Sequence, residues 1–187
     1  MATLSISLSG SSAAKRILLI GAIGGTVAGM MMAMVEMLYG WASGAHTFWD
    51  APMAIWSWVG GLEHFGTPGN HVGPILLGLG GHMANSMMVG IVFAALMTAL
   101  RPRDDVTPIM VGVAFGRGDW AIMRYAILPL NQGESDLFTT GLVSPQWVWW
   151  LAHAVLGMTA GLVYDGARRL LPQPSSAPLR HEAPSAA

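Results

Sequence analysis

The sequence predicts an all-α fold, a polytopic membrane protein whose four transmembrane helices form a bundle. Apolar residues make up 53% of the chain and charged residues only 10%, and the mean hydropathy is +0.51. A soluble domain of this length does not have such a composition. Most of the chain is therefore expected to be surrounded by lipid.

The distribution of charge predicts the topology. Outside the apolar stretches, the basic residues occur before the first stretch, between the second and third, and after the fourth: Lys15, Arg16, Arg101, Arg103, Arg168, Arg169 and Arg180. The two remaining connections carry only acids, namely Asp50, Glu63, Glu134 and Asp136. This positive-inside pattern predicts an even number of spans, with both termini in the cytoplasm. The protein is expected in the inner (plasma) membrane of the cell.

Four apolar stretches are long enough to cross a hydrocarbon core of about 30 Å. The first helix is expected at 17–39, interrupted only by Glu36, and the second at 72–100, which has no formal charge. The third, at 106–130, contains Arg117, Asp119 and Arg124 and is the most polar. The fourth, at 147–166, begins with a tryptophan-rich belt. Together they predict one transmembrane domain over 15–170.

The segments outside this domain are expected to differ in order. Residues 1–14, rich in serine, and 171–187, rich in proline, serine and alanine, bury too little apolar surface to offset the ordering entropy, so both ends are predicted to be disordered. The outer loop 40–71 holds several tryptophans, and 52–60 is predicted to be a short interfacial helix. It reads either as an anchoring aromatic belt or as a cap over the bundle.

The spacing of similar residues suggests a tandem duplication of a two-helix unit. An offset of 71 lays His82 on His153 and Gly90 on Gly161, which relates the second and fourth helices. An offset of 91 lays Gly21 and Gly25 on Gly112 and Gly116, which relates the first and third. Since glycine is common in membrane helices, chance can produce part of this match.

The layout resembles the YagU-like small four-helix inner-membrane proteins, a family whose function is largely unknown. The residues that carry the likeness are Gly80-Gly81-His82 with Gly90, the stretch 112–129, and His153 with Gly157, Gly161 and Tyr164. The resemblance covers the four spans and not the outer loop or the tail. It implies a four-helix membrane fold and brings no activity.

Ionisable groups inside the spans are candidates for a polar cluster, since each costs about 2.5–3.5 kcal/mol at the centre of a membrane helix. Arg117 and Arg124 are seven residues apart and are expected to share a face that points into the bundle. Glu36 is at a similar depth to Arg124, so an ion pair between them is predicted. With Asp119 and Asn85 these residues form either a network that locks the helices together or a proton or anion pathway.

His82 and His153 are expected at matching depth in the outer third of the membrane. They are candidate ligands of a haem b iron, or of a divalent metal such as zinc or copper with help from His46, His64 or His71 of the outer loop. The alternative is that each imidazole forms an interhelical hydrogen bond. The 14 methionines invite a copper site, but consecutive methionines point around the whole helix, so packing is the better account.

Several function classes are disfavoured. A net charge of -1 provides no basic field for nucleic acid, and the absence of cysteine excludes disulfides and thiol chemistry. We expect a protein without enzymatic activity, a structural or accessory component that associates with itself or with other membrane subunits. The alternatives are a haem- or metal-binding redox protein that uses His82 and His153, and a small proton or solute carrier that uses Arg117, Arg124 and Glu36.

Overall fold

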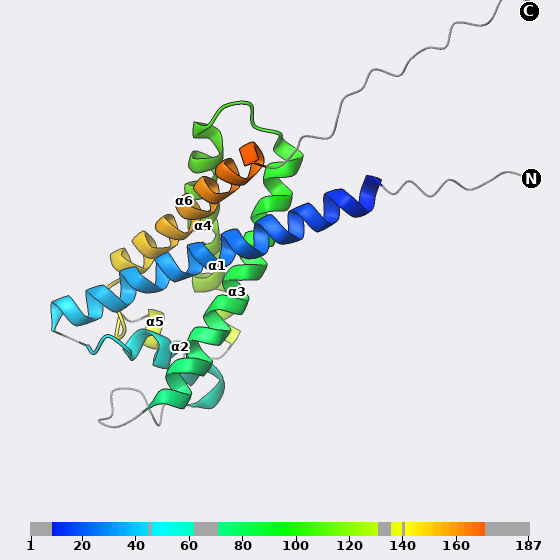
Figure 1. Ribbon diagram of the computed structural model, residues 1–187. Helices are drawn as coiled ribbons and strands as arrows, with labels where there is room; N and C mark the ends of the chain where they lie inside the picture. The colour runs from blue at the N-terminus through cyan, green and yellow to red at the C-terminus, as the bar shows by residue number, and fades with distance from the viewer. Residues whose placement is uncertain (1–8, 45, 62–70, 131–135, 140, 171–187) are drawn as a thin grey trace, which may run out of the picture.

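The computed structural model describes residues 9–44, 46–61, 71–130, 136–139 and 141–170. Every regular element in these ranges is helical, which confirms the all-α class (Figure 1). The elements are α1 (Ser9–Ser43), α2 (Asp50–Gly60), α3 (Val72–Leu100), α4 (Val106–Ile122), a π-helix (Met123–Ile127), a 3-10 turn (Leu128–Leu130), α5 (Asp136–Thr139) and α6 (Gln146–Leu170).

Three helices are long and apolar enough to cross a membrane: the Ala14–Ser43 part of α1, α3 and α6. The chain is therefore a membrane protein by length and composition. The bounds of α3 match the predicted 72–100. The helix α1 begins at Ser9, so residues 9–14, expected to be disordered, are helical. Residues 1–8 and the predicted tail 171–187 lie outside the described residues.

The third predicted span, 106–130, is helical throughout but is not one α-helix. At Leu128 the backbone N–H donates to the carbonyl of Met123, five residues back, which is the π-helical pattern. Pro129 follows and has no N–H to donate, so the ordinary α-helical ladder cannot continue through it. The helix type therefore changes at Met123, and the described helical run extends to Leu130.

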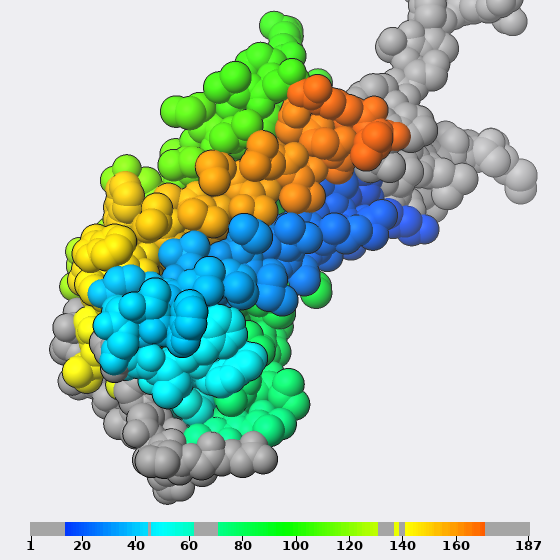
Figure 2. All heavy atoms as spheres, turned by 60° about the vertical axis from the view of Figure 1, so that its left-hand side comes forward, coloured from blue at the N-terminus to red at the C-terminus, as the bar shows by residue number. Residues whose placement is uncertain are grey.

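The four longest helices pack in the order α3, α1, α6, α4. The most extensive contacts are those of α1 with α3 and of α4 with α6, followed by those of α1 with α6, whereas α3 and α4 scarcely touch. Figure 2 shows α1 and α6 side by side along most of their length. Residues of α1, α3 and α6 supply most of the main core, with Phe93, Met97, Trp149 and Leu156 among its largest members.

Glycines set the close approach within each antiparallel pair. A Cβ atom on Gly25 of α1 would overlap the carbonyl oxygen of Ser86 on α3, and one on Gly112 of α4 would overlap that of Gly157 on α6. Similarly, Gly90 faces the backbone of Gly21 and Gly161 faces that of Pro108. Both pairs are thus held by backbone-to-backbone van der Waals contact, as is usual for membrane helices.

These contacts shift the predicted correspondence between α1 and α4 by one helical turn. If Ser86 corresponds to Gly157, an offset of 71, then their contact residues Gly25 and Gly112 correspond, which is an offset of 87. The contacts thus favour an offset of 87 over the predicted offset of 91, which laid Gly25 on Gly116. Sequence matching favoured the latter because glycines recur every fourth residue on both helices.

The predicted outer loop contains the expected short helix, α2, and one face of this helix is buried against the rest of the protein. The residues of α2 that face inward are buried, from Asp50 to Ala54 and at Ser57. It packs mainly against the first half of α3, where the carbonyl oxygen of Pro52 occupies the space beside Gly78. A Cβ atom at Gly78 would overlap that oxygen, so α2 packs closely against α3 at this point.

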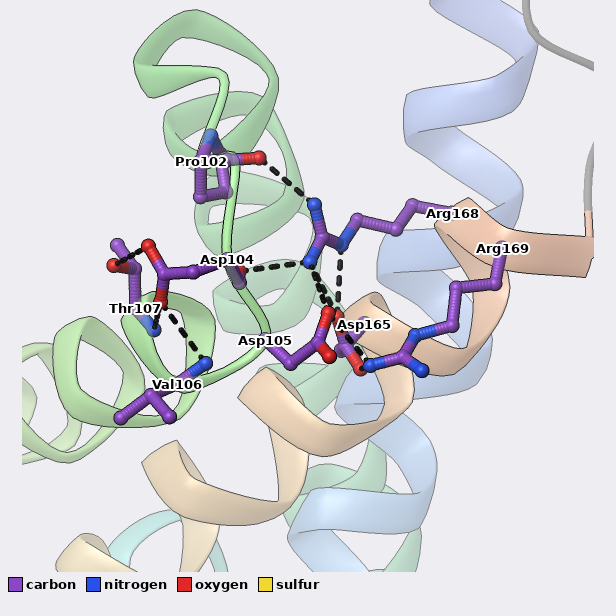
Figure 3. A network of polar contacts seen from close by, with 8 residues as sticks. All are labelled: Pro102, Asp104, Asp105, Val106, Thr107, Asp165, Arg168 and Arg169. Atoms are coloured by element: carbon purple, nitrogen blue, oxygen red, sulfur yellow. Dashed lines mark hydrogen bonds and ion pairs between the residues drawn. The ribbon is translucent and has the colours of Figure 1, made fainter.

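The opposite end of the molecule gathers the start of α1, the α3–α4 connection and the end of α6 (Figure 1). Figure 3 shows how Arg168 of α6 binds the connection: Nη1 donates to the carbonyl of Pro102 and Nη2 to that of Asp104, both at 2.8 Å. Arg168 and Arg169 also pair with Asp165 and Asp105 at 2.7–3.0 Å. The connection is thereby bound to α6.

Asp104 prepares the start of α4. Its carboxylate accepts hydrogen bonds from the Thr107 hydroxyl and from the backbone N–H groups of Val106 and Thr107, at 2.7–3.0 Å. These bonds satisfy N–H groups that the first turn of a helix leaves open. The hydrogen bond from the Thr107 side chain is the main reason that the pKa of Asp104 lies below its usual value.

Candidate functional site

The candidate site is a buried polar core where α1, α3, α4 and α6 meet. His82 and Ser86 of α3 and His153 of α6 are buried, and Asp119 of α4 is exposed by only 15% of its side chain. The glycine contacts of α1 with α3 bring Gly29 against Ser86. The same close packing that shapes the fold therefore draws these groups together.

His82 is bonded to α1. Its Nε2 lies 2.9 Å from the carbonyl oxygen of Gly29, and a carbonyl oxygen accepts only, so Nε2 carries the proton. The other ring nitrogen, Nδ1, then holds a lone pair. An interhelical hydrogen bond was one of the two roles predicted for His82, the other being ligation of a haem iron or another metal.

His153 is bonded to its own helix and faces an acid. Its Nδ1 donates to the carbonyl oxygen of Trp149 at 2.8 Å, which leaves the lone pair on Nε2. That nitrogen lies 4.0 Å from Asp119 Oδ2, which is beyond hydrogen-bonding distance. Aromatic rings surround the pair, since Trp149 stacks edge-on against both His153 and Trp120, with centroids 5.3 and 6.3 Å apart.

His82 and His153 are both buried in this polar core. Their imidazoles are near enough for an electrostatic interaction. Each presents one proton-accepting nitrogen, Nδ1 of His82 and Nε2 of His153. The arrangement can hold a proton between His153 and Asp119 or offer two neutral imidazole ligands.

A fuller metal site is not assembled within the described part of the chain, where no three histidine or acidic side chains converge. His46 lies instead beside Asp50, with Nδ1 3.5 Å from Oδ2, in the turn that precedes α2. His71 directly precedes α3. The third loop candidate, His64, lies outside the described residues.

The predicted ion pair of Glu36 with Arg124 is wrong. Both residues are described and no ion pair joins them; Arg124 Nη1 donates to Gln146 Oε1 at 2.5 Å, and its guanidinium lies 5.5 Å from the Tyr125 ring. Glu36 is 7% exposed, and its Oε1 has no hydrogen bond to any described residue. The two side chains lie in different surroundings.

Arg117 does not point into the bundle, which also corrects the prediction. It is exposed, and its guanidinium carbon lies 4.3 Å from the centroid of the Trp150 ring on α6. Spacing relates the predicted face of Arg117 to that of Arg124, but it does not give the rotation of α4 about its axis, because apolar residues occur on all sides of this helix. Asn85, the remaining predicted member, is half-buried on α3.

Two features of the core have no clear signal in the sequence. Ser86 Oγ and Trp120 Nε1 are buried without a hydrogen bond to any described residue. An apolar groove also separates α3 from α4, with a cavity volume of about 330 Å³, and Asp119 lies in its lining. Only the packing of the helices reveals it.

Comparisons with protein-family models, with characterised proteins and with solved structures find no match to this chain. The resemblance to the YagU-like proteins therefore stays a prediction.

Proposed function

We propose that the chain crosses the inner (plasma) membrane four times, with both termini in the cytoplasm. Beside α1, α3 and α6, the continuous helical run from α4 to the 3-10 turn would be the fourth span, and it packs along α6 through glycine contacts. The helix ends that carry basic residues lie at one end of the molecule, which supports the positive-inside orientation (Figure 1).

The natural absence of cysteine makes this topology easy to test. A single cysteine at Val59, an exposed residue in the last turn of α2, should react with a membrane-impermeant maleimide applied to intact spheroplasts. One at Asp104 should react only after permeabilisation. Labelling of the Asp104 position from outside contradicts the orientation.

The two helix pairs, α1 with α3 and α4 with α6, suggest how the fold arose. The glycine contacts of α1 with α3 and of α4 with α6 align at offsets of 87 and 71, which supports a tandem duplication of a two-helix unit. The two units would run in parallel, related by an axis along the membrane normal. The unit would then carry one histidine on its second helix.

Within the membrane, the chain acts as a structural or accessory component of a larger assembly and not as an enzyme. One observation carries this proposal: Arg117 is exposed on α4, within the fourth span. A lipid-facing arginine costs about 2.5–3.5 kcal/mol, and stacking on Trp150 offsets only part of that. A second protein that covers Arg117 removes the cost.

Purification in a mild detergent tests the proposal. Wild-type protein should elute as a complex with a fixed stoichiometry of further membrane subunits or copies, and Arg117→Ala should release them. Arg169→Ala, which removes an exposed arginine at the end of α6, is the matched control and should leave the complex intact. A wild-type protein that elutes as a monomer under the same conditions overturns the proposal.

A second candidate function, metal or haem binding, is favoured by the two imidazole nitrogens of the polar core. His82 Nδ1 and His153 Nε2 are oriented as acceptors by the hydrogen bonds of the other ring nitrogens. A metal held there would need further ligands from a partner or from solvent. The carrier hypothesis has less support, because Arg117, Arg124 and Glu36 lie in three separate environments.

The absorbance spectrum and metal content of protein purified from membranes distinguish these functions. A Soret band, or one metal per chain that is lost in both His82→Ala and His153→Ala but kept in His46→Ala, supports the second candidate. If the purified protein contains neither haem nor stoichiometric metal, the second candidate is rejected and the assembly role is the remaining proposal.

A further inference from the structure

We propose that the partner that covers Arg117 is a second copy of this chain, and that each Arg117 enters the α3–α4 groove of the other copy and pairs there with Asp119. This inference rests on the proposed assembly role and names its partner. The two α4 helices would cross at Gly118 about a two-fold axis along the membrane normal.

The groove lies between α3 and α4, which pack against each other much less closely than the other neighbouring pairs of long helices do. Helices α1 and α6 contact each other extensively, but α3 and α4 meet mainly where Phe93 packs on Phe115, with ring centroids 5.3 Å apart. Beside this contact the groove remains open. Its lining includes Met88 and Val92 of α3 and Phe115, Gly118, Asp119 and Ile122 of α4.

Asp119 gives this apolar groove a single acidic group. Among the described residues, its only charged or titratable neighbour within ion-pair distance is His153, at 4.0 Å. Arg117, two residues away, has no carboxylate within 4.0 Å in the described ranges, and it contacts the Trp150 ring instead. The same helix thus carries a cation and an acid at one depth, each lacking an opposite charge in close contact within its own copy.

The helix geometry lets two copies satisfy both groups. Residues two apart on an α-helix point about 200° apart, so Arg117 and Asp119 project to opposite sides of Gly118. When two parallel helices meet at Gly118 across a two-fold axis, the Arg117 side of one faces the Asp119 side of the other. An interface of this isologous kind forms two identical ion pairs.

Gly118 leaves room for that approach. It is exposed, and a Cβ atom on it would have nothing within 4 Å. Two copies inserted with the same topology are parallel, and a two-fold axis along the membrane normal relates such copies without inverting either one. An acyl chain could fill the apolar groove, but it would leave Arg117 and Asp119 without an ion pair, and for that reason a second copy is the better occupant.

A charge-swap experiment tests the pairing. Arg117→Asp and Asp119→Arg place like charges in both pairs of their own dimers, so each variant alone should lose self-association at least tenfold. Mixed together, the two variants restore opposite charge in both pairs and should form a heterodimer. Two affinity tags, co-expression, and light scattering of the detergent-solubilised protein measure both results.

Gly118→Leu should block the dimer by bulk, whereas Gly73→Leu, at an exposed and open position at the start of α3, should not. Should Asp119→Arg fail to fold, Arg117→Gln and Asp119→Asn replace the swap. Each should weaken association, and the double variant should be no weaker than either single one, because the same pair is lost.

The inference is overturned if the single variants dimerise like wild type, or if folded single variants fail to pair when mixed. It is also overturned if the groove of wild-type monomers is labelled by a photoreactive phospholipid and the charge changes have no effect. A monomeric wild type that still carries other membrane subunits in an Arg117-dependent way rejects the dimer but supports the assembly role.

Discussion

At the scale of single residues, the polar core shows how a buried group depends on its hydrogen bond. His82 lies 2.9 Å from the Gly29 carbonyl and so joins α3 to α1, whereas the hydroxyl of Ser86, one turn away on the same helix, is buried without a hydrogen bond to any described residue. A satisfied buried donor stabilises a fold, and an unsatisfied one costs free energy.

These two side chains therefore make a matched pair of substitutions. His82→Ala should lower the free energy of unfolding by about 1–3 kcal/mol, because it removes the interhelical hydrogen bond and leaves a cavity where the imidazole was packed. Ser86→Ala should leave stability unchanged or raise it. Thermal unfolding in detergent, followed by circular dichroism, gives both values; an equal loss in the two variants would contradict the assignment.

Asp104, outside the spans, predicts a dependence of stability on pH. Its folded pKa lies below the ordinary aspartate value of 3.8, mainly because of the hydrogen bond from the Thr107 side chain. The contribution of this carboxylate to stability is therefore complete above pH 3.8 and is lost as the pH falls through the lower, folded pKa. The difference in Tm between wild type and Asp104→Asn should be constant near neutrality and shrink in acid. A difference that stays constant in acid would show that the capping charge contributes nothing.

At the scale of helices, the sequence located the elements well but not their rotations. Length and hydropathy gave α3 to the residue and the extent of 106–130, because crossing lipid requires a set length of apolar chain. The faces were predictable only where glycine marks a close contact, as at Gly25 and Gly112. For Arg117 no such signal existed, since a helix in lipid is apolar on all sides, and its predicted inward orientation was wrong.

The glycine contacts carry a prediction for the pairing of α1 with α3. Gly25→Ala places a methyl group on the Ser86 carbonyl oxygen, so the helices must move apart, at a cost of about 1–3 kcal/mol. Gly80→Ala adds the same methyl group on an exposed part of α3 where nothing lies within 4 Å. The midpoint of thermal unfolding should fall only for Gly25→Ala, and a similar fall in both variants would mean that glycine content, and not this contact, controls stability.

At the scale of the whole molecule, the two ends are built differently. The end with α2 and α5 is closed by apolar packing, in which Ala51 and Ala54 of α2 lie against Ala33 and Met37 of α1. The opposite end is closed by charge, through Arg168 and the α3–α4 connection (Figure 3). Composition predicted the basic residues at that end, but which arginine binds backbone carbonyls depends on a fold that spacing does not give.

Arg168 and Arg169 therefore have different roles despite being neighbours. Arg168 donates to the carbonyls of Pro102 and Asp104 and to Asp165, a set that uses the full guanidinium fork, while Arg169 pairs, among the described residues, with the carboxylates of Asp165 and Asp105 alone. Lysine keeps the charge but lacks the fork. Because Asp105 is mostly exposed, its ion pairs contribute little.

Arg168→Lys should therefore lower the free energy of unfolding by about 1–2 kcal/mol, whereas Arg169→Lys should change it by less than about 0.5 kcal/mol. The freed α3–α4 connection should also become more accessible, so trypsin should cut after Arg103 faster in Arg168→Lys than in wild type or in Arg169→Lys. Since both variants retain the same net charge, equal cleavage rates in the two would show that charge alone closes this end, without the hydrogen bonds to the backbone.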